Sequence, residues 1–143
     1  MDLLSSVTLM KADGSEQPAE VFLEKAEIIC LYFSAHWCPP CRAFTPVLKD
    51  FYEEASANGV EIIFVSSDRS LEEQISYMKA SHGDWPAIMF GSEIAPALKK
   101  KFEISGIPAL IVINKMTGKV ITTQGRNDVQ SKGPGCVDVW KQQ

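Results

Sequence analysis

The run from Ile28 to Phe33 most constrains how this chain can fold. All of its residues are apolar, and it has the length of one strand. Such a run is typical of a central strand that is covered on both faces of a sheet. Arg42 to Ala57 follows with apolar residues three and four apart, which indicates one buried face of a helix. Val60 to Ser66 then repeats the strand pattern. The order strand, helix, strand predicts an α/β fold.

The remaining segments continue this alternation and end in a hairpin. Val7 to Met10 predicts a strand that turns at Asp13-Gly14, and Ser70-x-x-Glu73 is a capping box that opens a helix. We expect helices at Glu20 to Ala26, Ser70 to Lys79 and Ala95 to Phe102, a strand at Ala87 to Phe90, a hairpin of Ala109 to Ile113 with Val120 to Thr123, and a last helix after the break at Gly133-Pro134-Gly135 within Val129 to Trp140. This pattern predicts an α/β sandwich with a mixed sheet.

Length and charge narrow the class of protein. The 143 residues correspond to one domain, 1–143, which can bury about two thirds of its unfolded surface and needs no disulfide to hold a core. The net charge of −4 disfavours nucleic acid as a direct partner. The longest apolar runs fall far short of the roughly twenty residues that cross a bilayer. Residues 1–6 lack the features of a secretory leader, so we expect a cytoplasmic protein, with the nucleus as an alternative.

Cys38 and Cys41 carry the chemical signal of the sequence. They flank Pro39 and Pro40 and stand between the predicted strand and the predicted helix. At a helix start, residues three apart lie on one face and reach disulfide geometry. Cys38 at the N-cap position would meet the positive end of the helix dipole, which favours its thiolate. Because the prolines lack amide hydrogens, we expect the Cys41 amide to donate to the Cys38 sulfur.

This arrangement predicts thiol–disulfide exchange. Cys38 would attack a disulfide as a thiolate, and Cys41, one turn deeper, would resolve the mixed disulfide. A zinc site built from both cysteines with His36 and His82 is an alternative, but no second CxxC or HxxxH pattern exists to support it. A purely structural cysteine pair is the other alternative. We therefore expect neither a metal nor another cofactor.

The segment from Leu31 to Arg42, followed by Phe44-Thr45-Pro46, resembles the active-site segment of tryparedoxins and nucleoredoxins, a branch of the thioredoxin superfamily. Phe64-Val65-Ser66-Ser67-Asp68, Ile107-Pro108 and Ile121 to Arg126 extend the similarity. The resemblance implies a thioredoxin fold, in which helices flank a mixed sheet with an N-terminal hairpin, and protein disulfide reductase activity. It also implies a cis peptide bond before Pro108.

Site residues follow from this resemblance. Cys38 and Cys41 are the redox pair. Substrate-binding candidates are Trp37, Pro39, Pro40, Ile107, Pro108 and Arg126. Thioredoxins carry a buried Asp six residues before the first cysteine, and here that position is Tyr32. Asp68 is therefore our candidate proton carrier for Cys41, although it equally fits a residue that initiates the turn into the next helix.

The other two cysteines are predicted to differ from each other. Cys30 lies in the buried strand and should be inert, whereas Cys136 lies in a Gly-Pro-Gly segment and is predicted to be accessible. Cys136 is a bystander thiol or, alternatively, the link of a dimer of an otherwise monomeric protein.

Two functions fit the whole sequence. The first is a reductase of protein disulfides in signalling proteins or transcription factors, recharged by an electron-donating reductase or a low-molecular-weight thiol. The second is a binding module for such proteins, which oxidation of the cysteine pair controls.

Overall fold

Strand β3, Ile28–Ser34, occupies the interior of the sheet and organises the fold. In the computed structural model, which describes residues 4–143, β3 pairs in parallel with β4 (Val60–Ser66) and antiparallel with β6 (Ala109–Asn114). Every residue of β3 is buried. The prediction of a strand covered on both faces is confirmed. The sequence analysis found no features of a secretory leader in residues 1–6, and residues 1–3 of that segment lie outside the described residues.

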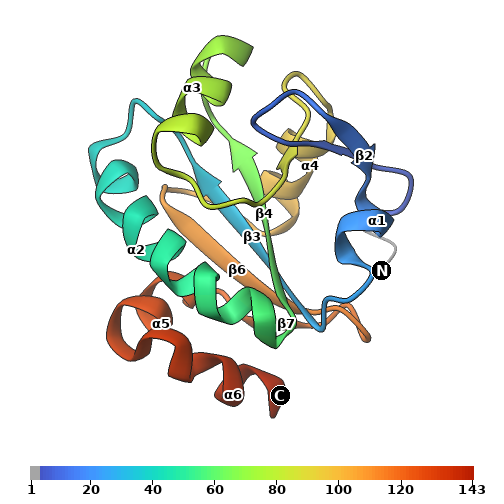
Figure 1. The fold of residues 1–143 in the computed structure, drawn as a ribbon, viewed down its shortest axis with the longest axis vertical. Coiled ribbons are helices and arrows are strands. Elements are labelled where there is room, and N and C mark those ends of the chain that lie inside the picture. Colours follow the sequence, from blue (N-terminus) through green and yellow to red (C-terminus); the bar gives the residue numbers. More distant parts are fainter. Residues whose placement is uncertain (1–3) are drawn as a thin grey trace.

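The sheet is mixed and has seven strands in the described residues, in the order β2-β1-β5-β4-β3-β6-β7 (Figure 1). The outer strands are β1 (Thr8–Met10), β2 (Glu16–Pro18), β5 (Ala87–Ile88) and β7 (Val120–Thr122). The predicted N-terminal hairpin is confirmed as the antiparallel pair β1 and β2, and the predicted C-terminal hairpin as β6 and β7. Together with the flanking helices, this arrangement is the thioredoxin fold with an N-terminal hairpin.

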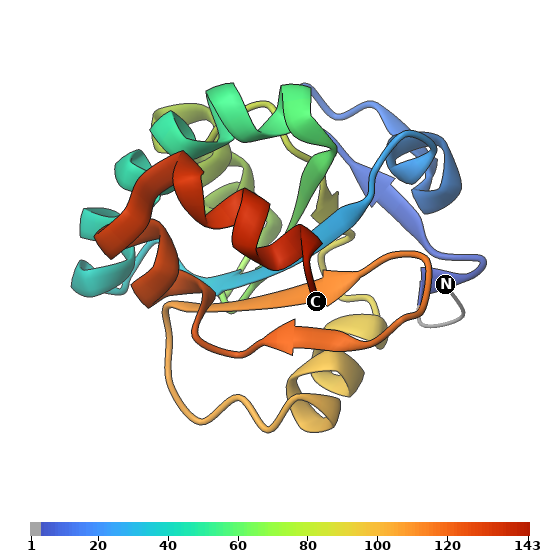
Figure 2. The same ribbon diagram turned by 90° about the horizontal axis from the view of Figure 1, so that it is seen from below.

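Helices cover both faces of the sheet. They are α1 (Ala19–Leu23), α2 (Pro39–Ala55), α3 (Leu71–Ser81), α4 (Ile94–Lys101), α5 (Gly125–Lys132) and α6 (Cys136–Lys141). The even-numbered residues of β3 pack with residues of α2, α3, α5 and α6, and the odd-numbered residues pack with those of α1 and α4. Figure 2 shows α4 on one side of the sheet and α2, α5 and α6 on the other. None of the helices in residues 4–143 is long and apolar enough to cross a membrane.

Local signals in the sequence account for several helix ends. The Ser70 hydroxyl accepts a hydrogen bond from the Glu73 amide at 3.1 Å, so the predicted capping box is confirmed at its N-cap. After α2, one turn of 3-10 helix leads to Gly59, whose φ of 85° lies in the left-handed region. The helix predicted from Arg42 to Ala57 therefore runs from Pro39 to Ala55.

The C-terminal segment differs from its prediction. Helix α5 begins at Gly125, ahead of Val129, and α6 follows the Gly133-Pro134-Gly135 turn. Cys136 starts α6 and is 1% exposed, so the prediction of an accessible thiol is wrong. The physical reason is that α6 folds back onto α2, with Trp140 packed against Phe51 at a ring-centroid distance of 5.7 Å. Burial raises the pKa of Cys136 to about 12.

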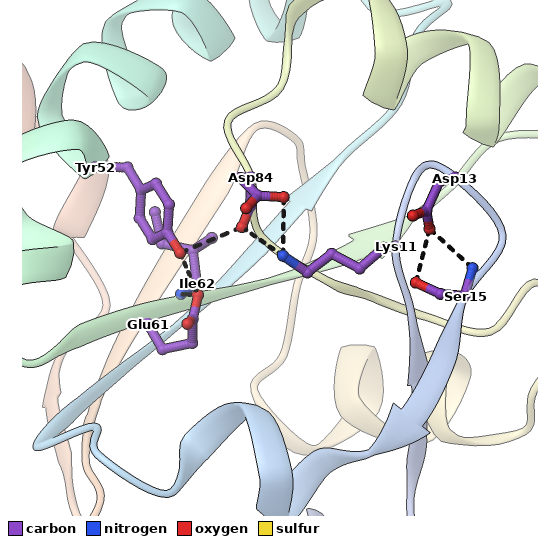
Figure 3. A network of polar contacts seen from close by, with 7 residues as sticks. All are labelled: Lys11, Asp13, Ser15, Tyr52, Glu61, Ile62 and Asp84. Atoms are coloured by element: carbon purple, nitrogen blue, oxygen red, sulfur yellow. Dashed lines mark hydrogen bonds and ion pairs between the residues drawn. The ribbon is translucent and has the colours of Figure 1, made fainter.

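A polar network ties the N-terminal hairpin to the rest of the sheet (Figure 3). Lys11 donates to the Asp84 carboxylate at 2.8 Å. Tyr52 of α2 donates to the Glu61 carboxylate of β4 at 2.8 Å, and its hydroxyl lies 3.4 Å from the Asp84 carbonyl oxygen. Burial raises the pKa of Glu61. The hydrogen bonds from Tyr52 and the Ile62 amide lower it, but they offset only part of this rise.

Glu61 should therefore make stability depend on pH. A carboxyl group whose folded pKa is raised contributes stability below its unfolded pKa and loses it as pH rises through the folded value. We expect Glu61→Gln, which keeps an acceptor for Tyr52, to raise the free energy of unfolding at about pH 7.5 but not at about pH 4. Urea unfolding at both pH values measures this, with exposed Glu53→Gln as control. An equal effect of Glu61→Gln at both values would contradict the interpretation.

Candidate active site

The loop between β3 and α2 places the cysteine pair at one end of the sheet. Cys38 is the N-cap residue of α2, with φ −95° and ψ 112°, and Pro39 and Pro40 fill the first two helical positions. The Arg42 amide donates to the Cys38 carbonyl at 3.0 Å, which closes the first helical turn. Pro39 and Pro40 are exposed, while Cys41 faces inward. The predicted position of the pair at the helix start is confirmed.

Asp68 and its neighbours hold this loop in place. The Asp68 carboxylate accepts the His36 amide at 2.7 Å through one oxygen and the Ser66 hydroxyl at 2.6 Å through the other. The Trp37 indole N–H donates to the Ser67 carbonyl at 3.0 Å. These bonds join the loop before α2 to the carboxyl end of β4.

The two sulfur atoms have different surroundings. Cys38 is 5% exposed and Cys41 is fully buried, so the prediction that Cys38 is the more exposed member is confirmed. The Cys38 thiol lies 3.8 Å from the Ile107 carbonyl oxygen. We expected the Cys41 amide to donate to the Cys38 sulfur, and this prediction is wrong. Within the described chain, the Cys38 side chain makes no capping hydrogen bond. Its thiol is aimed across the loop at Ile107 instead.

The expected cis bond between Ile107 and Pro108 is confirmed. Ile107 is half-buried and packs against the small cluster that contains both active-site cysteines, and Pro108 is buried beside it. The loop before β6 therefore forms one wall of the site, and the loop before α2 forms the other.

Cys41 lies in surroundings that favour its neutral thiol. Burial raises its pKa to about 11, and the neighbouring Cys38 adds to the rise. The polar groups of Ser34 and the Ala35 backbone oppose this rise in pKa. Cys30, inside β3, has its pKa raised chiefly by complete burial, which agrees with the prediction of an inert thiol.

A chain of buried hydroxyl groups next to Cys41 is the feature that sequence reasoning missed. Ser34 and Tyr77 are 2.7 Å apart, Tyr77 and Thr45 are 2.6 Å apart, and Thr45 and Tyr32 are 2.7 Å apart, each measured between hydroxyl oxygens. Thr45 also donates to the Cys41 carbonyl at 2.8 Å. The sequence carries one hint of this contact, since Thr45 stands four residues after Cys41 on α2.

The remaining candidates lie around this centre. Trp37 is 43% exposed, with the Arg69 guanidinium 5.4 Å from its ring centre. Arg126 is half-buried at the start of α5 and lies 5.8 Å from the centre of the Phe44 ring. The Arg126 Nε atom is buried and finds no hydrogen-bond partner in residues 4–143. Only part of this guanidinium group is therefore available to a substrate.

The zinc interpretation finds no donor set in the described residues. No group of three or more His, Cys, Asp or Glu side chains within 4–143 is placed to hold a metal ion. His82, one of its four donors, lies in the core, where its Nδ1 accepts the Trp85 indole N–H at 2.9 Å. Burial lowers the pKa of His82 to about 3, with a smaller contribution from His36.

Comparison with known proteins identifies the family of this chain. Residues 26–120 match a family described as thioredoxin-like. The chain belongs to the thioredoxin-like family. It falls in the nucleoredoxin and tryparedoxin branch of that family.

Three similar proteins illustrate this membership. A probable nucleoredoxin 1 of Arabidopsis thaliana is 42% identical over 107 residues, which cover 73% of this chain and 18% of that protein. The crystal structure of a thioredoxin from Wuchereria bancrofti has a TM-score of 0.85 at 48% identity and covers 97% of this chain and 96% of that chain. Tryparedoxin II complexed with glutathionylspermidine has a TM-score of 0.83 at 33% identity, over 96% of this chain and 94% of that chain.

The nucleoredoxins that match are several times longer than this chain. The chain spans between 18% and 26% of the first nucleoredoxins that it matches. Similarity to these longer proteins therefore describes one thioredoxin-like domain of each.

Gly125 allows α5, and with it Arg126, to approach the sheet closely. A Cβ atom at this position would lie 2.8 Å from the Leu110 carbonyl oxygen and 2.8 Å from a Val112 methyl group. We expect Gly125→Ala to lower the free energy of unfolding by about 1–3 kcal/mol because of this overpacking. Gly135→Ala is the control, since a Cβ there meets nothing within 4 Å. Equal unfolding midpoints in urea for the two variants would contradict the close approach.

Asp68→Asn tests the role of that carboxylate. Its hydrogen bonds go to the loop before α2 and to Ser66, so we expect the variant to lose about 1 kcal/mol of stability, because one acceptor becomes an amide group. We expect the pH profile of disulfide reduction to keep its shape. A shifted profile at unchanged stability would instead support the proton-carrier interpretation. Thermal unfolding and initial rates from about pH 5 to pH 9 provide the two readouts.

Proposed function

We propose that this domain reduces disulfide bonds in protein substrates, with Cys38 as the nucleophile and Cys41 as the resolving thiol. The observation that carries the proposal is the asymmetry of the pair. Cys38 keeps 5% of its surface exposed at the N-terminus of α2 and faces the Ile107 carbonyl, while Cys41, one turn deeper, is fully buried. A nucleophile that can be reached and a protected partner are what sequential attack and resolution require.

The reaction balances over two exchanges. The Cys38 thiolate attacks one substrate sulfur, so a mixed disulfide forms and the other substrate sulfur leaves with the electron pair and takes up a proton. Cys41 then attacks Cys38, which releases the second substrate thiol and leaves a Cys38–Cys41 disulfide. The substrate has gained two electrons and the domain has lost them. A reductase or a low-molecular-weight thiol must then restore the pair, and glutathionylspermidine, named with tryparedoxin II, is a thiol of that class.

Substrate recognition is proposed to use the surface around Cys38. Trp37, Pro39 and Pro40 are exposed there and offer apolar contacts. Ile107 and Pro108 border the nucleophile on the other side, where an extended substrate segment can lie along the loop before β6. Arg126 adds a positive charge near Phe44. We propose intracellular signalling proteins or transcription factors as substrates, in the reducing environment of the cytoplasm or nucleus.

A redox-controlled binding module is the second candidate, and one observation favours it. Only 5% of Cys38 is exposed, yet Trp37 next to it is 43% exposed. Most of the exposed surface here therefore belongs to Trp37, which can contact a partner, and little of it belongs to the Cys38 nucleophile. In this alternative a partner protein binds that surface and is released when the pair oxidises.

Single cysteine substitutions test the proposed reaction. We expect Cys38→Ser to reduce disulfide turnover to the uncatalysed rate, because the nucleophile is lost. Cys41→Ser should attack once and then accumulate a mixed disulfide. Insulin reduction measures turnover, and non-reducing mass spectrometry measures the trapped adduct. Cys136→Ala is the matched control, since it removes a buried thiol and should retain activity.

Two results would redirect the assignment. Full turnover by Cys38→Ser would refute the nucleophile. Partner binding that is unchanged by the double Cys38→Ser and Cys41→Ser substitution, in a wild type with little turnover, would favour the binding module.

A further inference from the structure

Two exposed arginine side chains are fixed against the two residues that precede the nucleophilic cysteine. Arg42, near the start of α2, donates through Nη1 to the His36 carbonyl oxygen at 2.8 Å. The Arg69 guanidinium lies over the face of the Trp37 ring, 5.4 Å from its centre. Both guanidinium groups therefore border the loop that carries the nucleophile.

These contacts position each guanidinium group and leave donors free on it. A guanidinium carries five N–H donors, and Arg42 uses one of them on the His36 carbonyl. The attraction between a cation and an aromatic face requires no hydrogen bond, so it leaves the Arg69 donors available. Trp37 cannot swing away easily, because its indole N–H is bonded to the Ser67 carbonyl oxygen at 3.0 Å. Both cations are held by the protein and can still bind an acceptor.

No carboxylate within residues 4–143 neutralises these two charges. Both ion pairs of the described chain are made by lysines, so neither arginine is paired there. Asp68 is bound to the same loop, but its two oxygens accept the His36 amide and the Ser66 hydroxyl. Glu72 and Glu73, in the first turn of α3, lie outside ion-pair distance of both arginines. The described part of the loop region thus holds two cations without a counter-charge, although the protein has a net charge of −4.

The strand order decides on which side of Cys38 the Arg69 charge lies. β3 has β4 on one edge and β6 on the other (Figure 1). Because β4 is parallel to β3 and β6 is antiparallel, Arg69 after β4 and Ile107 before β6 both lie at the end of the sheet where β3 leads into the active-site loop. The Cys38 thiol lies 3.8 Å from the Ile107 carbonyl oxygen. A substrate segment that runs along Ile107 to Cys38 therefore meets Arg69 on the far side.

Arg42 is attached to the same side through His36. The His36 amide donates to Asp68 at 2.7 Å, and the His36 ring stacks on Tyr77 of α3 at a centroid distance of 4.9 Å. Both of these partners follow β4 in the chain. The residue that Arg42 binds is thus anchored on the side of Arg69, and the two positive charges act on the same part of a substrate.

We propose that Arg42 and Arg69 form a carboxylate-binding subsite, which selects protein substrates that carry acidic side chains on one side of the disulfide. This inference rests on the proposed reductase function and names its substrate class. A guanidinium group binds a carboxylate through two parallel N–H···O bonds, a geometry that lysine lacks. The ligand is an acidic polypeptide segment, because the subsite adjoins the loop along which an extended chain can lie. The subsite holds the substrate, and no proton or electron passes through it.

The expected preference is modest and depends on salt. One exposed ion pair favours binding by a factor of about three, so two pairs should give about tenfold. Screening weakens such pairs, because the Debye length falls from about 30 Å at 0.01 M ionic strength to about 3 Å at 1 M. We expect the protein to reduce an acidic substrate about tenfold faster than a neutral one at low ionic strength, and nearly equally fast at high ionic strength.

Matched disulfide peptides test the proposal. They share one sequence and one disulfide but carry either glutamates or glutamines on one side of the reactive cysteine, and a second pair carries them on the other side. Reduced protein is mixed with excess oxidised peptide, and acid-quenched samples give the second-order rate constant of peptide reduction. The readout is the ratio of the rate constants for the acidic and the neutral peptide. A change in the reactivity of Cys38 or in folding affects both peptides alike and leaves this ratio unchanged.

Four substitutions alter the subsite, and one serves as control. We expect Arg69→Gln and Arg42→Gln each to lower the ratio about threefold. Arg69→Glu should invert the preference, because a carboxylate there repels the acidic peptide. Arg69→Lys keeps the charge without the planar donor group and should give an intermediate ratio. Lys119→Gln removes an exposed charge from the turn between β6 and β7, at the opposite end of the sheet, and should keep the wild-type ratio.

The outcomes separate this proposal from the function on which it rests. Wild-type protein that reduces neither peptide would contradict the reductase function itself. Reduction of both peptides with a ratio near one at low ionic strength would refute the subsite alone. An equal fall of the ratio in Arg69→Gln and Lys119→Gln would do the same, since net charge would then set the preference. So would an equal preference for glutamates on either side of the disulfide. Thermal unfolding reports the folding of each variant, and an unchanged ratio in Arg69→Glu would refute the subsite even where Arg42→Gln fails to fold.

Discussion

The pairing of β3 on both edges is the constraint on which the rest of this structure depends. β3 is bonded along its length to β4 and β6, and its side chains point alternately into two apolar clusters. A strand held in this way has a fixed register, because a slip of one residue would exchange the two faces. The end of β3 is therefore fixed in space, and α2 starts from that fixed point. The position of Cys38 follows from the packing of residues that have no chemistry of their own.

The sequence predicts the parts of this arrangement that are set by local pattern. The apolar runs of β3 and β4, the C-terminal hairpin, the capping residue Ser70 and the cysteine pair at a helix start all carry their own signals, and the structure confirms them. Helix α5 carries almost none. Within it only Gly125 and Val129 are buried, so its apolar pattern is too sparse to mark its first residue.

Other features depend on contacts between distant segments and could not be predicted. Local composition placed Cys136 at the surface, but α6 returns to the core through Trp140, and the thiol goes with it. The hydroxyl chain joins residues as far apart as Tyr32 and Tyr77, and only the packing of α3 against α2 brings them together. The Cys38 side chain faces Ile107 across a separation of 69 residues because β3 pairs with β6, and only the family resemblance had made Ile107 a candidate.

The burial of Cys30 and Cys136 gives the domain two internal reporters of its own opening. Both thiols lie in the core cluster on the α2 side of the sheet, one in its central strand and one in its last helix. A reagent that modifies thiols can reach them only when part of this core opens, and the free energy of such openings differs between the end of a chain and a central strand. The modification rate of Cys136 thus gauges detachment of α6, and that of Cys30 gauges loss of the sheet itself. The same molecule holds its Cys38 and Cys41 pair at one end of the sheet and, in its interior, two thiols that report on its folding.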